Sequence, residues 1–199
     1  MNGIISYLTL QGATTESGFA FIFKEGKWRF VVITDGANDV FPTISEWPGI
    51  EIPFDGNTWT HIAGTYNGTT AKIFKNGVEE ESYSGDDIGG SILWEDIDTD
   101  LFFGKYLDGN NSFKGSIDEV RLWDIARLED EIQVSMNSTV DVNESRLVGY
   151  WTFNDNQSAT IVDHAEGIPP PGTFPGVLTN NGNGTWDTDV FAESGSDCF

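Results

Sequence analysis

Three aspartates alternate with other residues in segment 94–100, Trp-Glu-Asp-Ile-Asp-Thr-Asp. If this segment is extended, Asp96, Asp98 and Asp100 share one face, because side chains two apart in a strand point the same way. Such a row of carboxylates can bind Ca²⁺ or a polar ligand, or it can be a solvated acidic loop. An EF-hand calcium loop beginning at Asp96 is excluded, since its sixth position would be Leu101 instead of Gly and its twelfth Leu107 instead of Glu.

A second set of carboxylates lies at the ends of apolar strand faces. In a strand over residues 116–124, Asp118 points to the same side as Val120 and Leu122. Asp155 likewise follows Trp151 on one face of a later strand. A part-buried carboxylate needs a cation or several N–H donors, so each of these acids requires a partner.

Ca²⁺ would satisfy these acids, because it prefers oxygen ligands and would relieve part of the self-repulsion of an acidic chain. We predict one structural Ca²⁺ at Asp118 and Asp155, with Asp163 as a further ligand, that fixes the strand over 147–153. In the alternative, Asp118 accepts N–H bonds from its loop or pairs with Arg121 or Lys114.

Aromatic and amide side chains in loops could recognise a sugar, because rings stack on sugar C–H faces while Asn and Asp bond hydroxyl groups. The candidate ligand-binding residues of this kind are Trp47, Trp94, Tyr106, Asp108, Asn110 and Asn111. Ordinary turn chemistry is the alternative explanation for the Asn-rich loop. The tryptophans that alternate within strand-like segments are predicted to lie in the core, namely Trp28, Trp59, Trp123 and Trp151.

The composition excludes several classes of partner. Ten Lys and Arg against 32 Asp and Glu give the 199-residue chain a net charge of −22, so nucleic acid is not an expected partner. No apolar run approaches the roughly 18 residues that span a bilayer, so membrane insertion is not predicted. His61 and His164 lack the neighbouring residues that a zinc site or a nucleophilic triad would need.

Strands must position these candidate residues. Residues 18–34 predict a hairpin of aromatic and β-branched residues, and residues 58–83 predict a three-stranded meander. Asn-Gly at both corners of the meander favours type I′ turns, whose central residues need φ > 0. Later strands are predicted over 101–105, 113–123 and 147–153, and a helix near 125–137 with Asp124 as its N-cap.

Two segments resemble a known family. Trp-Thr-His-Ile-Ala-Gly-Thr-Tyr-Asn-Gly at 59–68 is followed by Lys-Ile-Phe-Lys-Asn-Gly at 72–77, and Phe-Lys-Gly-Ser-Ile-Asp-Glu-Val-Arg-Leu-Trp occupies 113–123. With the helix that follows, these segments resemble a laminin G-like, pentraxin-like jelly roll of the concanavalin A-like lectin/glucanase superfamily. The resemblance implies an all-β fold, a two-sheet antiparallel jelly-roll sandwich with one short surface helix. It also implies a structural Ca²⁺ at the acid of the Asp-Glu-Val-Arg strand.

The resemblance leaves several functions open, because this scaffold carries lectins, adhesion modules and glycosidases. We expect a non-catalytic carbohydrate-binding or adhesion module of a larger secreted or cell-surface protein, with a carbohydrate or glycoprotein as ligand. The alternative is a β-glucan-type glycoside hydrolase using Asp96, Asp98 and Asp100, with a nucleophile and an acid about 5 Å apart. The glycosidases of the superfamily use Glu at these positions, which disfavours catalysis. A structural spacer in an adhesin is the third class.

The segment over 147–155 resembles the strand that usually opens such a domain, although here it comes late in the chain. We predict a single sandwich over residues 1–191, in which 147–191 supplies the opening strand in permuted order. An unpaired aromatic strand would favour aggregation, which supports folding back. The alternative is that this segment begins a next repeat. Residues 192–199 are predicted to form a flexible tail.

Overall fold

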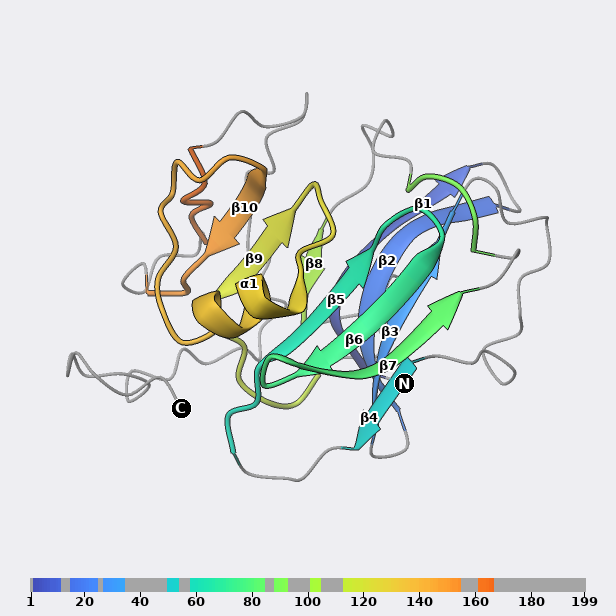
Figure 1. Cartoon of the computed structure of the whole chain (residues 1–199), viewed down its shortest axis with the longest axis horizontal. Coiled ribbons are helices and arrows are strands. Elements are labelled where there is room, and N and C mark those ends of the chain that lie inside the picture. The colour runs from blue at the N-terminus through green and yellow to red at the C-terminus, as the bar shows by residue number, and fades with distance from the viewer. Residues whose placement is uncertain are drawn as a thin grey trace. The chain divides into compact units, whose positions relative to one another are not determined.

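A computed structural model describes residues 2–11, 15–24, 27–34, 50–53, 58–84, 88–92, 101–104, 113–154 and 161–166. Within these residues, ten strands form three antiparallel sheets and one α-helix is present (Figure 1). The predicted all-β fold class is therefore confirmed. The chain divides into two compact units, one of Met1–Ser116 with Ile125–Met136, the other of Ile117–Asp124 with Asn137–Phe199.

The first unit contains a five-stranded sheet in the order β4-β3-β2-β1-β8. Its strands are β1 (Asn2–Gln11), β2 (Thr15–Lys24), β3 (Lys27–Ile33), β4 (Ile50–Pro53) and β8 (Phe102–Phe103). Alternate residues of β3 are buried, as expected of a strand with one face on the core. The Phe30 ring of β3 packs on Phe21 of β2 with 4.9 Å between centroids, and Trp28 packs on Phe23 at 5.2 Å. The predicted hairpin over 18–34 is thus confirmed.

The second sheet of this unit is the predicted three-stranded meander of β5 (Ile62–Tyr66), β6 (Thr70–Lys75) and β7 (Val78–Ser84). At the β6–β7 corner, Asn76 and Gly77 have φ angles of 49° and 79°, as a type I′ turn requires. The type I′ prediction is wrong at the β5–β6 corner, where Thr69 adds a third loop residue. There the Asn67 side chain accepts the Thr69 and Thr70 N–H groups at 3.1 and 2.9 Å, which forms an Asx turn.

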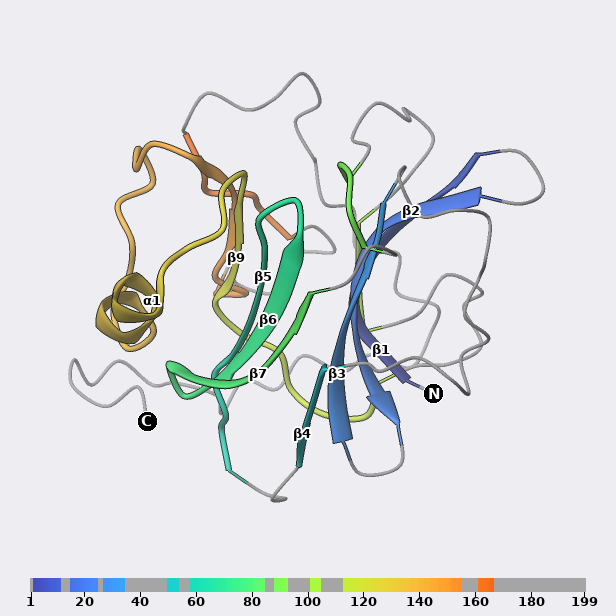
Figure 2. The ribbon, with the colours of Figure 1, turned by 45° about the vertical axis from the view of Figure 1, so that its right-hand side comes forward.

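The meander and the five-stranded sheet face each other as two layers (Figure 2). Gly64 of β5 lies so close to the Phe30 ring that a Cβ atom would come within 2.5 Å of its Cδ2. Ile73 and Phe74 of β6 and Tyr7 of β1 are exposed by 1 % or less, so the core lies between the two sheets. The predicted two-sheet sandwich is confirmed in this unit.

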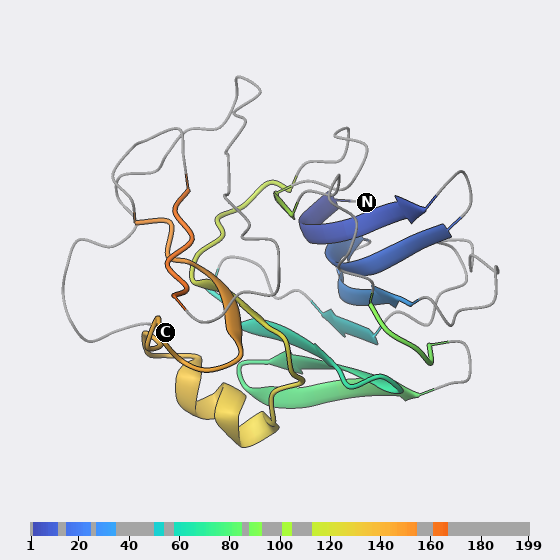
Figure 3. The same cartoon turned by 90° about the horizontal axis from the view of Figure 1, so that it is seen from above.

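The helix α1 (Glu129–Ser135) is shorter than predicted and packs beside the end of the meander (Figure 3). Its N-cap is Leu128 and not Asp124, because the Glu131 carboxylate accepts the Leu128 N–H at 2.8 Å and begins the helix there. The apolar residues of this segment differ in burial: Ile132 is buried, whereas Ile125 is 40 % and Leu128 64 % exposed.

The second unit contains a two-stranded ribbon of β9 (Val120–Trp123) and β10 (Leu147–Trp151), in which Arg121 lies opposite Tyr150. All five residues of β10 are buried. The strand predicted over 113–123 begins only at Val120, because Glu119 has a φ of 52°, outside the β region. A single sandwich over 1–191 stays a prediction, and the tail over 192–199 lies outside the described residues.

The four tryptophans predicted for the core differ in burial. Trp28 and Trp151 are buried, with 7 % and 1 % exposed, and Trp123 is partly buried. Trp59 contradicts the prediction, because 44 % of it is exposed. Strand β5 begins at Ile62, so the strand alternation on which the prediction rested does not reach Trp59.

Candidate functional site

Many of the sequence-predicted site residues lie outside the described residues. They are the ligand-binding candidates Trp47, Trp94, Tyr106, Asp108, Asn110 and Asn111, the acidic row Asp96, Asp98 and Asp100, and the metal candidate Asp155. Asp118 and Asp163 are described, and both belong to the unit that contains the β9–β10 ribbon.

Asp118 lies two residues before β9 and is partly buried. Its Oδ1 accepts the N–H of Glu119 at 2.9 Å, the one hydrogen bond that this side chain makes within the described residues. Burial raises the pKa of the Asp118 carboxyl from 3.8 to about 6; the Glu119 N–H bond acts in the opposite direction, and the Glu119 charge adds to the rise. Asp118 thus accepts one backbone N–H bond, whereas its predicted pairing with Arg121 is wrong, because Arg121 pairs with Glu119.

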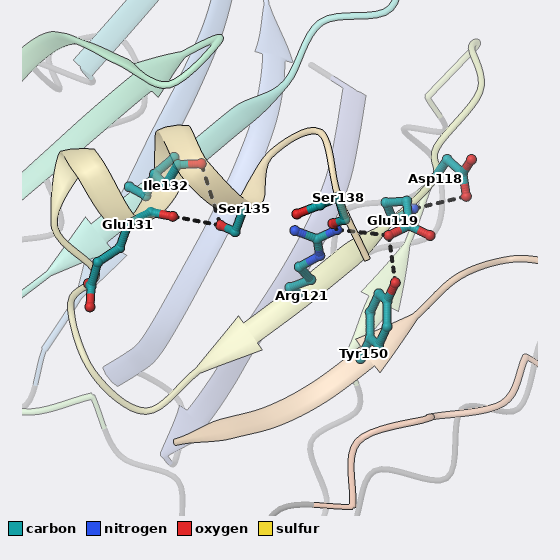
Figure 4. Close-up of polar contacts among 8 residues, drawn as sticks. All are labelled: Asp118, Glu119, Arg121, Glu131, Ile132, Ser135, Ser138 and Tyr150. Atoms are coloured by element: carbon teal, nitrogen blue, oxygen red, sulfur yellow. Dashed lines mark hydrogen bonds and ion pairs between the residues drawn. The ribbon is translucent and has the colours of Figure 1, made fainter. Parts of the chain in front are cut away.

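The neighbouring acid, Glu119, is the residue that pairs with Arg121. The Arg121 Nη2 donates to Glu119 Oε2 at 2.9 Å and to the Ser138 carbonyl at 2.6 Å, and the Tyr150 hydroxyl donates to the same Oε2 at 2.7 Å (Figure 4). The Arg121 guanidinium also lies 5.5 Å from the centre of the Tyr150 ring. These contacts join the residue before β9, β9 itself, β10 and the loop at Ser138.

This network is a structural contact within the unit that contains the β9–β10 ribbon. The Arg121 side chain is only 11 % exposed, so the charge of Glu119 compensates its desolvation. Burial raises the pKa of Tyr150 to about 12, and the bond and the charge of Glu119 act in the same direction. Glu119 Oε2 receives two donors, one from Arg121 and one from Tyr150. The Glu119 carboxylate therefore links β9 to β10 and is not offered to a ligand.

Asp163 is a backbone-capping acid in the structure. Its Oδ1 accepts the N–H groups of Tyr150 and Ala165 at 2.9 and 3.0 Å, while the His164 N–H donates to the Tyr150 carbonyl at 2.7 Å. Segment 161–166 is thereby tied to the edge of β10. Within the described part of the chain, no three His, Cys, Asp or Glu residues are grouped closely enough to hold a metal ion. The calcium site that includes Asp155 stays a prediction.

Sequence reasoning missed two features of these elements. It did not single out Tyr150, although a buried Tyr needs a hydroxyl partner, and the Glu of the Asp-Glu-Val-Arg segment supplies it. It also placed Trp59 in the core, although Trp59 stands between two threonines and before a histidine. Polar neighbours on both sides were the available signal that this segment is exposed.

The described elements are an antiparallel β-sandwich in one unit and, in the other, a two-stranded ribbon that carries the Glu119–Arg121 ion pair. Residues 3–133 match a laminin G-like family of the concanavalin A-like lectin/glucanases superfamily, and the chain belongs to this family. The resemblance drawn from the sequence is confirmed.

Other proteins share part of the sequence or the fold. The chain is 33 % identical to mouse (Mus musculus) pappalysin-1 over 82 residues and 32 % identical to the human (Homo sapiens) protein over 121 residues. These matches cover 40 % and 58 % of this chain but only 5 % and 7 % of the relatives' length. A crystal structure of a candidate carbohydrate-binding protein from Bacteroides ovatus has the same fold, with a TM-score of 0.55, 19 % identity and coverage of 81 % of this chain and 48 % of that one.

The helix in the described parts of the chain, α1, is not long and apolar enough to cross a membrane.

Proposed function

We propose that this chain is a non-catalytic carbohydrate-binding module, which binds a free glycan or the glycan of a glycoprotein. The observation that carries the proposal is membership of the lectin/glucanases superfamily over residues 3–133. The shared fold of the candidate carbohydrate-binding protein from Bacteroides ovatus agrees with it. The described carboxylates also agree, since Glu119 and Asp163 are engaged in bonds within the fold.

We further propose that the module belongs to a larger secreted or cell-surface protein. The proposal is supported by the pappalysin-1 relatives, of which this chain spans less than a tenth. An antibody against the purified module should label intact source cells or their culture medium. Labelling that requires permeabilised cells would contradict an outside location.

Binding and turnover are separated by two assays on the same protein. Immobilised glycans should retain the wild-type chain, and soluble forms of the same glycans should yield no new reducing ends. Trp47→Ala and Trp94→Ala should each weaken binding about tenfold if these rings stack on the sugar. Val134→Ala is the matched control, because Val134 is 80 % exposed on α1 and is not a candidate ligand residue.

Each of three results would contradict the proposal and indicate a different function. Release of reducing ends that Asp96→Asn or Asp98→Asn abolishes would make the chain a glycoside hydrolase. Retention by a glycoprotein after complete deglycosylation would indicate adhesion through protein. A chain that binds no glycan and no glycoprotein would be a structural spacer.

A structural Ca²⁺ at Asp118, Asp155 and Asp163 remains part of the proposal. It is supported by the partly buried Asp118 carboxylate, which receives a single N–H bond within the described residues. Ca²⁺ that binds the folded chain alone should raise the melting temperature, and millimolar Mg²⁺ should raise it less, because Mg²⁺ demands strict octahedral geometry. A melting curve that neither Ca²⁺ nor EDTA moves would exclude this site.

A further inference from the structure

Trp59 is the most exposed aromatic residue in the described part of the chain. It lies on segment 58–61, which leads into β5, and 44 % of it is exposed. An indole exposed to this extent offers part of its apolar ring surface to solvent, and an indole also carries one polar N–H. Such a surface suits a ligand that is apolar on one side and polar around its rim.

Two hydrogen bonds fix the backbone next to this ring. The His61 N–H donates to Asn76 Oδ1 at 3.0 Å, and the Asn76 N–H donates to the His61 carbonyl at 2.9 Å. Asn76 belongs to the type I′ corner between β6 and β7, and Gly77 of that corner packs against Gln133 and the side chain of Met136. Trp59 is therefore attached to a rigid corner, and little backbone ordering would oppose ligand binding.

Uncharged polar groups accompany Trp59 at this end of the meander. Asn76 is exposed and commits its Oδ1 to His61, which leaves the side-chain N–H groups as donors on the surface. Thr58 is exposed and carries a hydroxyl that can donate or accept. Val78, 51 % exposed at the start of β7, adds apolar surface to the same corner.

We propose that Trp59 is a stacking platform for a neutral carbohydrate, flanked by Asn76 and Thr58; this inference rests on the carbohydrate-binding function proposed above. The ring accepts the C–H face of a sugar, and the amide and hydroxyl groups bond its hydroxyls. The ligand is neutral because the chain carries a net charge of −22, and three consecutive glutamates, 79–81, follow Val78 on β7. Sulfated or uronate-rich glycans are repelled by this charge.

The test follows each tryptophan separately by ¹⁹F NMR of the full chain labelled with 5-fluorotryptophan. The chain has seven tryptophans, and Trp59→Phe assigns the Trp59 signal by its absence. Neutral cello-, xylo-, manno- and laminari-oligosaccharides are titrated in parallel with a heparin-derived oligosaccharide. The Trp59 signal should shift with at least one neutral sugar; Trp59→Ala should weaken that binding about tenfold, and Trp59→Phe by less. Melting curves of both variants verify that they fold.

The outcomes separate this inference from the proposed function. If other tryptophan signals shift and the Trp59 signal does not, the chain binds carbohydrate elsewhere and the Trp59 platform is wrong. If no signal shifts and immobilised glycans retain nothing, both proposals fail. If the heparin-derived oligosaccharide binds more tightly than the neutral sugars, the charge argument and the neutral ligand class are wrong.

Discussion

Replacing Asp118 with Asn tests whether this carboxylate destabilises the folded chain or binds a cation. Burial raises the pKa of Asp118 from 3.8 to about 6, so the folded chain binds a proton at this site more tightly than the unfolded chain does. The unionised form is therefore the one that favours folding. The ionised carboxylate lowers the free energy of unfolding, and this penalty is fully present above pH 6 and disappears as the pH falls below about 4.

The magnitude follows from the two pKa values. A pKa difference of about 2 would correspond to about 3 kcal/mol for a fully enclosed group. Asp118 is only partly buried, so solvent screening reduces the expected penalty to about 1 kcal/mol. Asn is close in shape to the unionised carboxyl and does not titrate, so Asp118→Asn should remove this penalty at neutral pH.

Urea unfolding followed by tryptophan fluorescence, from pH 4 to pH 8 in EDTA, gives the difference between variant and wild type. In EDTA, Asp118→Asn should raise the free energy of unfolding by about 1 kcal/mol at pH 8 and leave it unchanged near pH 4. Subtracting the wild type removes the titration of the other acids. In millimolar Ca²⁺, the predicted ion should stabilise the wild type alone, which reverses the sign at pH 8.

A less stable Asp118→Asn variant at pH 8 in EDTA, or a difference that does not change with pH, would contradict the predicted burial penalty. The first result would mean that the carboxylate is already well compensated by its N–H bond. The second would mean that its pKa is not raised by folding. Equal differences in Ca²⁺ and EDTA would exclude Asp118 as a calcium ligand while leaving the burial argument intact.

Three further predictions test the packing and the hydrogen bonding. Gly64→Ala should lower the free energy of unfolding by about 1–3 kcal/mol, because its Cβ would come within 2.5 Å of the Phe30 ring, and Phe30→Leu in the same chain should restore part of the loss in urea unfolding. Gly77→Ala should lower the melting temperature more than Gly68→Ala: both have positive φ, but a Cβ at Gly77 would meet a helix side chain at 2.8 Å and one at Gly68 nothing nearer than 4.0 Å. Tyr150→Phe should lower the free energy of unfolding by about 1–2 kcal/mol, because it removes the hydroxyl bond to Glu119. In an ultraviolet titration, one tyrosine of the wild type should ionise only near pH 12, and this step should be missing from the variant.

The central strands could be predicted because their side-chain pattern and turn chemistry agree. Alternating large residues in β3 and the Asn-Gly corner before β7 each indicate one conformation. Strands β1 and β4 were not predicted, although β1 forms nine residue pairs with β2. Its sequence is less regularly alternating, and its position in the sheet is decided by pairing with β2 and β8, a long-range effect that a local pattern does not contain.

The candidate site was predictable in composition but only in part in connectivity. The sequence indicates that an acid near β9 needs a partner, and the structure assigns Arg121 to Glu119 and not to Asp118. Glu119 and Arg121 are two residues apart, a spacing that strand alternation places on one face, so this pair could have been predicted. The φ of 52° at Glu119, outside the β region, is the feature that no alternation rule anticipates. Asp163 was predicted as a calcium ligand, and in the structure its Oδ1 receives two backbone N–H groups.

The left-handed backbone at Glu119 connects the structural network to the predicted ion. A non-glycine residue in this conformation costs about 1–3 kcal/mol and persists only where other contacts hold it. At Glu119 the contacts are the ion pair with Arg121 and the bond from the buried Tyr150 hydroxyl. Because Glu119 takes the cation of the ribbon, Asp118 keeps a partly buried carboxylate with one N–H donor inside the described residues. Asp118, next to the strained residue, is therefore the acid at which the proposed Ca²⁺ would supply the missing partner.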